Sequence, residues 1–164
     1  EVNRMILESR GGWTEAVAYL LLLRGTFTVT MLRYLEKTAH NDAERTLYQY
    51  TLQDKARHMA YGLEHLQYAI AHQEDMTLIM QQLMFIGERV FAREMKDHVL
   101  REALAVVFAG GIEEAGTTGM ATYRQMMTAF MQDYMGSCEW LGVRRNPETM
   151  PRILVQYLPT DEEA

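Results

Sequence analysis

Residues 52–62 read LQDKARHMAYG and form the centre of a long segment without proline. The segment opens at Asn41, and Glu44 follows three residues later, a pair that is typical of a capped helix N-terminus. It predicts a single helix that ends at about His72. One stripe of this helix, at helical spacing, contains Tyr48, Leu52, Lys55, Met59, Gly62 and Leu66. Lys55 is therefore expected to face neighbouring helices.

Helical spacing of apolar residues recurs along the rest of the chain, and no alternating strand pattern stands out. The expected helices span residues 14–38, 41–72, 75–109 with a kink near 95–97, and 118–141, followed by a short final helix at 147–158. Gly110, Gly111 and Gly142 supply the stops. These lengths predict an all-α fold, an antiparallel bundle of four long helices with short helices at its ends.

The length of 164 residues corresponds to one domain. Residues 1–12 are expected to form the end of an upstream helix and a loop, residues 13–158 the helical bundle, and residues 159–164 an acidic tail. With 48% hydrophobic and 23% charged residues, the chain has the composition of a globular protein rather than a disordered one.

Charge and cysteine content narrow the classes of partner and compartment. The net charge is −6 and no long basic run is present, which argues against binding of nucleic acid. The single Cys138 cannot form an internal disulfide, so we expect a reducing, cytoplasmic location. The longest apolar stretch, residues 16–32, is interrupted by Arg24 and is shorter than the roughly 20 residues that span a bilayer, so a buried helix and no membrane contact are expected.

Arg24 lies in the middle of an apolar stripe of the first long helix. A guanidinium with apolar turns on both sides either extends to the surface along its own aliphatic stem or has an internal partner. The 13 methionines are either core residues or the lining of an apolar ligand pocket, and a core role is favoured. The alternative for one group on the last long helix is an exposed face for helix pairing in a homodimer: Met120, Tyr123, Met126, Met127, Met131, Tyr134 and Met135.

Two segments carry a resemblance to a known family: AVAYLLLLRGTF at 16–27 and YTLQDKARHMAYGLEHL at 50–66. They resemble two core helices of ferritin-like di-iron proteins, above all the para-aminobenzoate N-oxygenase-like and related ferritin-like oxygenases. Those proteins carry apolar-Glu-Gly on one helix and Asp-Glu-Ala-Arg-His-apolar-Ala-aromatic-Gly on the next. The resemblance covers roughly residues 13–70. It implies that the bundle is ferritin-like.

In the family, carboxylates and Glu-x-x-His pairs hold two metal ions inside the bundle. The resemblance places one ligand glutamate at Arg24, a second at Lys55 and the ligand histidine at His58. It places at Asp54 the acid that orients a ligand histidine, and Arg57 matches the residue before that histidine. Two ligand positions therefore hold cations, which repel a metal ion and offer no lone pair while protonated.

These substitutions imply a degenerate member of the family without a di-iron site or any other cofactor. It would act as a structural or partner-binding module, or would bind a small apolar ligand in the space that the metals left. Arg24 and Lys55 are then expected to point inward, towards Asp54 or towards acids from other helices: Glu88, Glu94, Glu113 or Glu114. A homodimer or another helix-packing partner is expected.

Two enzymatic alternatives remain open. In the first, the chain is a metal-dependent oxidoreductase, and iron is held by His58, Asp54, Glu94 and His98. In the second, it is an enzyme without a cofactor that uses Lys55 as a base or nucleophile, with a pKa lowered by burial and by Arg24. The family pattern also needs an upstream helix pair with further ligands. The chain is therefore either the C-terminal part of a longer protein or completes its bundle with other helices or a partner chain.

Two pairs of residues have simpler interpretations. His65 and His72 are expected at the surface or rim, with a hydrogen bond inside the bundle as a further possibility for His65. Glu113 and Glu114 are expected at a helix start, where the helix dipole favours acids.

Overall fold

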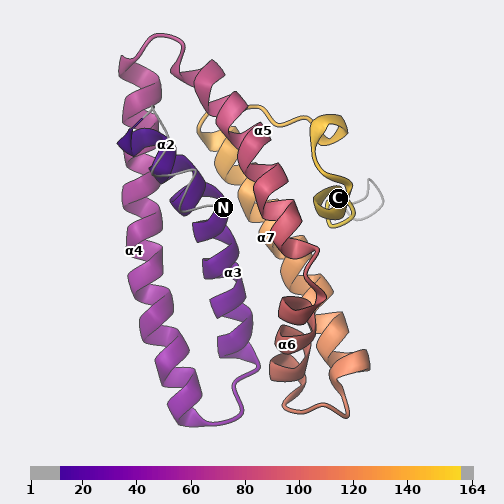
Figure 1. Cartoon of the computed structure of the whole chain (residues 1–164). Coiled ribbons are helices and arrows are strands. Elements are labelled where there is room, and N and C mark those ends of the chain that lie inside the picture. Colours follow the sequence, from indigo (N-terminus) through magenta and orange to yellow (C-terminus); the bar gives the residue numbers. More distant parts are fainter. Residues whose placement is uncertain (1–11, 160–164) are drawn as a thin grey trace.

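The computed structural model of the chain describes residues 12–159, and every regular element in this range is helical. Figure 1 shows their order. One continuous helix consists of α2 (Trp13–Val17), the π-helical segment η1 (Ala18–Leu23) and α3 (Arg24–Lys37). The others are α4 (Asp42–His72), α5 (Met76–Met95), α6 (His98–Ala109), the π-helical turn η2 (Ala115–Gly119), α7 (Met120–Trp140), the 3-10 turn η3 (Pro147–Thr149) and α8 (Arg152–Val155). The all-α prediction is confirmed.

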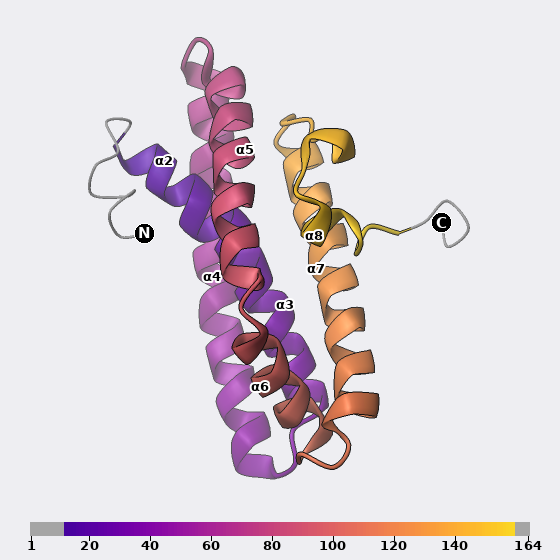
Figure 2. The same cartoon turned by 45° about the vertical axis from the view of Figure 1, so that its right-hand side comes forward.

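The helix from Trp13 to Lys37 occupies the centre of the molecule. Its segments η1 and α3 contact α4, α5, α6 and α7. Helix α4 runs back beside α3, while α7 lies against α3 from the other side (Figures 1 and 2). Helices α5 and α6 follow one another along the outside of the central helix. The expected central, largely buried helix is thus present, and α4 has only one long neighbour, α3.

Local signals at helix ends behave as the sequence indicates. The Asn41 side chain accepts a hydrogen bond of 2.9 Å from the backbone N–H of Glu44 and donates to the Glu44 carboxylate, which caps α4. Asp97 caps α6 by accepting from the N–H of Val99, so the expected kink is a complete break between two helices. Gly110 ends α6 in the left-handed conformation, with φ at 73°.

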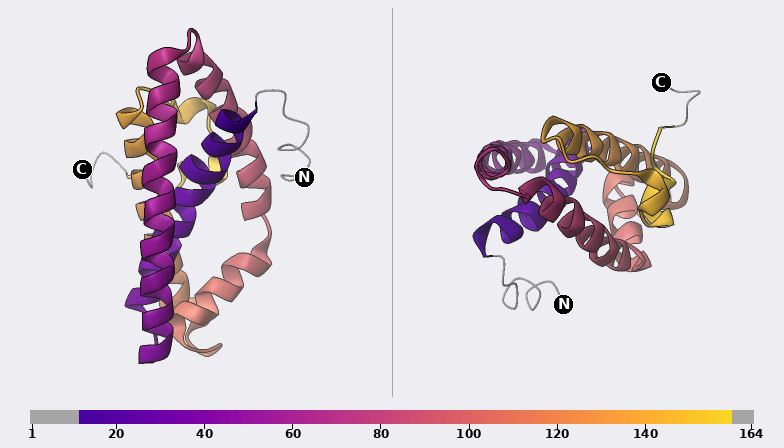
Figure 3. Two further views of the ribbon diagram at one scale, coloured as in Figure 1. Left: turned by 90° about the vertical axis from the view of Figure 1, so that its left-hand side faces the viewer. Right: turned by 90° about the horizontal axis from the view of Figure 1, so that it is seen from above.

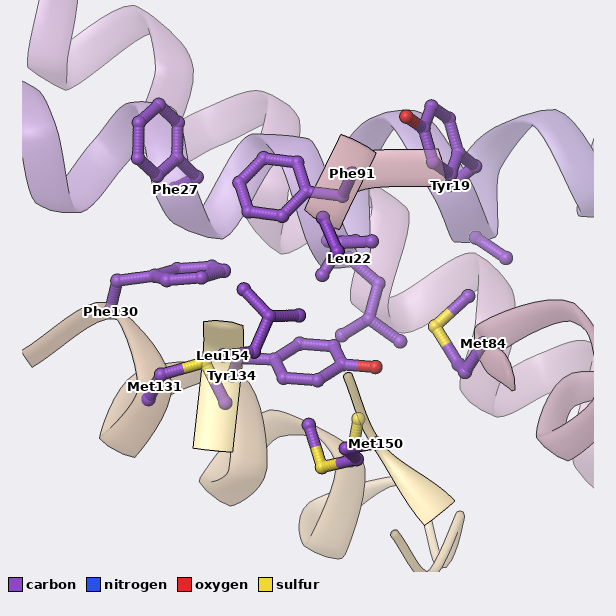
Figure 4. Packing of buried hydrophobic residues seen from close by; sticks show 14 of the residues in the cluster. Tyr19, Leu22, Phe27, Met84, Phe91, Phe130, Met131, Tyr134, Met150 and Leu154 are labelled. Carbon is purple, nitrogen blue, oxygen red and sulfur yellow. The ribbon is translucent and has the colours of Figure 1, made fainter. Parts of the chain in front are cut away.

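The core lies between the central helix, α5 and α7. Phe27, Phe91 and Phe130 form an aromatic triangle with ring centroids 5.3–5.5 Å apart (Figure 4). Methionines fill the space around it, and the fully buried ones are Met80, Met84, Met126, Met127 and Met131. The core role of the methionines is confirmed. The alternative, an exposed pairing face on the helix at 118–141, is wrong because Tyr123, Tyr134 and three of its methionines are buried.

Two segments depart from the expected helices. The sequence gives no sign of the π-helical segment Ala18–Leu23, because its leucines fit any helical register. Residues 147–158 form only the turn η3 and the single-turn helix α8, since Pro151 cannot donate within a helix and instead precedes the first turn of α8. The predictions for residues 1–11 and 160–164, an upstream helix end and the acidic tail, lie outside the described residues.

The long central helix also meets the length and composition of a membrane span. Its most apolar window is 50% buried within the protein, and it is the one such helix among residues 12–159. Because η1 and α3 pack against four other helices, this burial matches a core helix.

Two motif glycines lie where the central helix crosses α4. A Cβ at Gly25 would lie 2.5 Å from the Met59 sulfur, and a Cβ at Gly62 would lie 2.6 Å from Leu21 Cδ1 and 2.8 Å from Leu21 Cβ. Both glycines therefore allow close approach of two helices. The close packing of the two helices therefore explains both glycines of the motif segments without a metal ion.

Replacement of Gly62 by Ala is expected to lower the free energy of unfolding by about 1–2 kcal/mol, since overlap with Leu21 outweighs the gain in helix propensity. Gly136→Ala is the matched control, because Gly136 is a helix-interior glycine of α7 with open space around its Cα. That control is expected to raise stability by about 0.5–1 kcal/mol. Urea unfolding measures both. Equal effects of the two changes would show that Gly62 is not a close contact.

Candidate functional site

Arg24 lies at the junction of η1 and α3 and reaches the side chain of Glu94 on α5. Its Nη2 donates to Glu94 Oε2, and its Nε donates to the Tyr19 hydroxyl at 3.1 Å. The expectation that Arg24 points towards an acid from another helix is confirmed, and the acid is Glu94. This ion pair connects the central helix to α5.

The pair is partly open to solvent, with 38% of the Arg24 side chain and 34% of the Glu94 side chain exposed. Partial burial alone lowers the pKa of the Arg24 guanidinium, but the hydrogen bonds to Tyr19 and Glu94 outweigh it and raise this pKa above its usual value. Burial likewise raises the pKa of the Tyr19 hydroxyl. Arg24 is therefore a permanent cation that holds a hydroxyl and a carboxylate in place.

A small cavity of 340 Å³ adjoins the pair, at the break between α5 and α6. Its walls combine the Arg24–Glu94 pair with apolar side chains: Phe27, Phe91, Met95 and Leu100. The volume is at the lower end of that of small-molecule sites. The arrangement suits a small, mostly apolar molecule with one anionic or hydrogen-bonding group.

Lys55 is exposed, so the expectation that it points inward is wrong. Although it lies on the inward stripe of α4, its neighbours Leu52 and Met59 are only half buried, and the fully buried part of this helix begins at Gly62. At such an edge, a lysine reaches water at little cost, whereas burial would require a partner. The burial that the lysine-base hypothesis requires is also missing.

Asp54, Arg57 and His58 are exposed on α4 as well. The Asp54 carboxylate lies 3.7 Å from His58 Nδ1, and both side chains are more than half exposed. This is the contact expected of an acid that orients a histidine, but it lies at the surface. Within residues 12–159, no hydrogen bond or ion pair joins Arg24 to Lys55 or His58. The five motif positions do not converge on one site.

Glu94 and His98, the other suggested ligands, belong to different helices. Glu94 lies in the last turn of α5 and accepts from Arg24, whereas His98 is the exposed first residue of α6. The break at Asp97 removes the helical register that a spacing of four residues would need. Within residues 12–159, no group of three or more His, Cys, Asp or Glu side chains is placed to hold a metal ion.

Sequence reasoning missed the most deeply buried charges. Glu88 on α5 is fully buried and accepts from Arg145 Nη2 at 2.6 Å, from Arg145 Nε at 2.8 Å and from the Tyr134 hydroxyl at 2.7 Å. Arg145 lies in the loop after α7, with only 5% of its side chain exposed. Glu88 was one of five acids that Arg24 and Lys55 were expected to face. The signal that could have found its true role is its place in an apolar stripe, between Met84 and Phe91.

The thiol of Cys138 lies in the same region. Burial raises its pKa from 9.0 to about 12, against smaller opposing effects of Tyr134 and Arg145. At neutral pH it is a protonated core side chain.

The remaining predicted positions have local roles. His65 Nε2 lies 3.2 Å from the Thr14 hydroxyl, so the expected hydrogen bond within the bundle is present. His72 stacks on Tyr68 with ring centroids 4.0 Å apart and is exposed. Glu113 and Glu114 are exposed, and Glu114 accepts from Thr117 and Thr118 at the start of η2, which confirms the interpretation of these acids as a helix start.

The chain matches no family model, no curated protein and no solved structure. The resemblance to ferritin-like oxygenases therefore stays a prediction that depends on the two motif segments.

The two arginine pairs are expected to differ in stability. Arg145→Met leaves the Glu88 carboxylate buried without its cation and should cost about 3–5 kcal/mol of unfolding free energy. Arg24→Met removes a pair that is one-third exposed and should cost about 1 kcal/mol or less. Adding Glu88→Gln to Arg145→Met should recover much of the loss. Denaturant unfolding of the four proteins measures this, and equal losses in the two single variants would contradict it.

Proposed function

We propose that this chain is a metal-free, ferritin-like helical bundle that acts as a self-assembling, partner-binding module. The Arg24–Glu94 ion pair supports the metal-free part, since it puts a guanidinium where the resemblance places a ligand carboxylate. Glu94 accepts from Arg24 and is not a free ligand. The protein would thus keep the scaffold of an oxygenase while its role lies at its surface.

Exposed apolar side chains carry the assembly part of the proposal. Outward-facing positions of three successive helices hold large hydrophobic residues that are 37–83% exposed in and just after α4, α5 and α6: Leu47, Tyr50, Tyr61, Tyr68, Leu78, Ile79, Phe85, Ile86, Val99, Leu100, Val107 and Ile112. Helix α4 has 31 residues, and only three of them are buried. A helix that is so long and so sparsely buried is stabilised by packing against something further.

A small-ligand function is a second candidate. The cavity beside Arg24 favours it, because apolar walls and the polar Arg24–Glu94 pair together suit a small, mostly apolar molecule with a hydrogen-bonding group. It is compatible with assembly, since α4 does not line this cavity.

Self-association is the first test. Sedimentation velocity of the purified chain should show a dimer or larger species below about 100 µM, which corresponds to about −5.5 kcal/mol. A variant with one new acid on each of α4, α5 and α6 should be monomeric: Tyr61→Glu, Phe85→Glu and Val107→Glu. The matched control adds the same charge at exposed glutamines: Gln67→Glu, Gln132→Glu and Gln156→Glu. A wild-type chain that is monomeric throughout this range would contradict the proposal.

Iron content is the second test. The chain purified from iron-supplemented cells should contain far less than stoichiometric iron, because Arg24 has no lone pair to offer and already occupies Glu94. Stoichiometric iron that is lost in His58→Ala and kept in His72→Ala would establish the metal-dependent oxidoreductase instead. Iron that both variants keep would place a metal elsewhere and would equally contradict the metal-free proposal.

A further inference from the structure

The outward face of α4 lies open along the length of the helix. The left view of Figure 3 looks onto this helix, which lies in front of the others. Four large side chains point away from the bundle: Leu47 is 62% exposed, Tyr50 69%, Tyr61 57% and Tyr68 63%. Few single helices leave three tyrosines and a leucine in water, so this face has the character of an interface.

The spacing of these residues is that of a coiled-coil seam. Leu47, Asp54, Tyr61 and Tyr68 follow one another at intervals of seven. The alternate positions are filled by Tyr50, Arg57, Glu64 and Ala71. The seam lies on a different side of α4 from the buried residues Gly62, Leu66 and Ala69. Helix α4 therefore has two faces, one for α3 and one for a further helix.

Two charged residues near the middle of the seam, Asp54 and Arg57, limit which helices can pack against it. Asp54 and Arg57 are exposed in a single copy. A partner helix that covers the seam withdraws both from water, and each then needs an opposite charge from the partner. The partner must offer an acid and a base at matching positions, with aromatic or aliphatic residues on either side.

We propose that this partner is α4 of a second copy of the chain, packed antiparallel so that Asp54 of each copy faces Arg57 of the other. This inference rests on the self-assembly proposed above and specifies its interface. In this register Tyr50 of one copy faces Tyr61 of the other on both sides of the charges, and Leu47 packs on the aliphatic part of Glu64. The contact is two-fold symmetric and closes on itself.

Charge distinguishes this register from its nearest rivals. A parallel pair would place Asp54 against Asp54 and Arg57 against Arg57, and like charges in a closed interface cost several kcal/mol. An antiparallel pair shifted by one heptad would place Asp54 against Glu64. The proposed register alone among these three gives both Asp54 and Arg57 an opposite partner.

Two of the tyrosines are held in place before association. Tyr61 stacks on His65 with ring centroids 6.4 Å apart, and Tyr68 stacks on His72 at 4.0 Å. A side chain that is already restrained loses less rotamer freedom when it enters an interface. The seam thus presents fixed aromatic rings, which favours association of the folded chains.

Charge reversal tests the proposal in the full chain. Asp54→Arg and Arg57→Asp should each weaken self-association at least tenfold, because each places like charges opposite one another twice. The double variant with both changes restores opposite charges and should dimerise within about threefold of the wild type. Circular dichroism should stay unchanged in all three, and so should the unfolding free energy of the monomer, measured at a concentration too low for dimerisation, since both residues are exposed in one copy.

Disulfide trapping tests the register. Tyr50→Cys with Tyr61→Cys should give a covalent dimer on mild oxidation, while Tyr50→Cys with Tyr68→Cys and the single variant Tyr50→Cys should not. The native Cys138 is buried and does not interfere. Cross-linking of the single variant would indicate a parallel pair, and cross-linking of the second double variant the shifted register, and either result overturns the proposal.

The outcomes separate this inference from the proposed function. A chain that self-associates but is insensitive to both charge reversals assembles through another face, which overturns the inference and leaves the proposed function standing. A chain that is monomeric up to about 100 µM overturns both. Weakening by each single reversal, recovery in the double variant and cross-linking of the first cysteine pair together support the antiparallel dimer.

Discussion

A charged side chain that is withdrawn from water needs an opposite charge beside it, and this requirement determines how α5 is attached to the rest of the molecule. Glu88 and Glu94 lie on the same helix; Glu88 is fully buried, and Glu94 is about two-thirds buried. Arg145 holds the first, which secures the loop after α7, and Arg24 holds the second, which secures the central helix. Because each pair joins segments far apart in sequence, the two pairs determine which face of α5 points inward.

The local organisation of this fold follows from the sequence, and its tertiary pairing does not. Helix ends were predictable because Asn41 and Gly110 act within a few residues of their own positions. The methionine core followed from composition and spacing. The burial of Arg145 could not be predicted, because it lies in a loop, where the spacing of apolar residues does not indicate which side chains are buried. The partner of Arg24 was narrowed to a few acids, and only the arrangement of helices selected Glu94.

Lys55 shows the limit of reading a helix by its faces. A stripe on a helical wheel states which residues share a side, but it does not state how far along the helix a neighbour extends. Beside Gly62 the central helix is so close that Leu21 would meet a Cβ, whereas nearer the start of α4 the same stripe is only half covered. A lysine at that boundary reaches solvent with its long side chain. Arg24 therefore forms an ion pair with another helix, whereas Lys55 is exposed.

The glycines and the charged residues of the two motif segments have different roles. The glycines, Gly25 and Gly62, are explained by the crossing of two helices, and this requirement holds whether or not a metal is bound. The charged residues do not serve helix packing in this way. Arg24 forms an ion pair, and the charged residues of the second segment lie on an exposed face of α4. The residues that hold these two helices together are therefore not the charged residues of the motif. Selection on such a chain would then act on its surface, and the seam of α4 is where the described residues concentrate aromatic side chains that the fold itself does not bury.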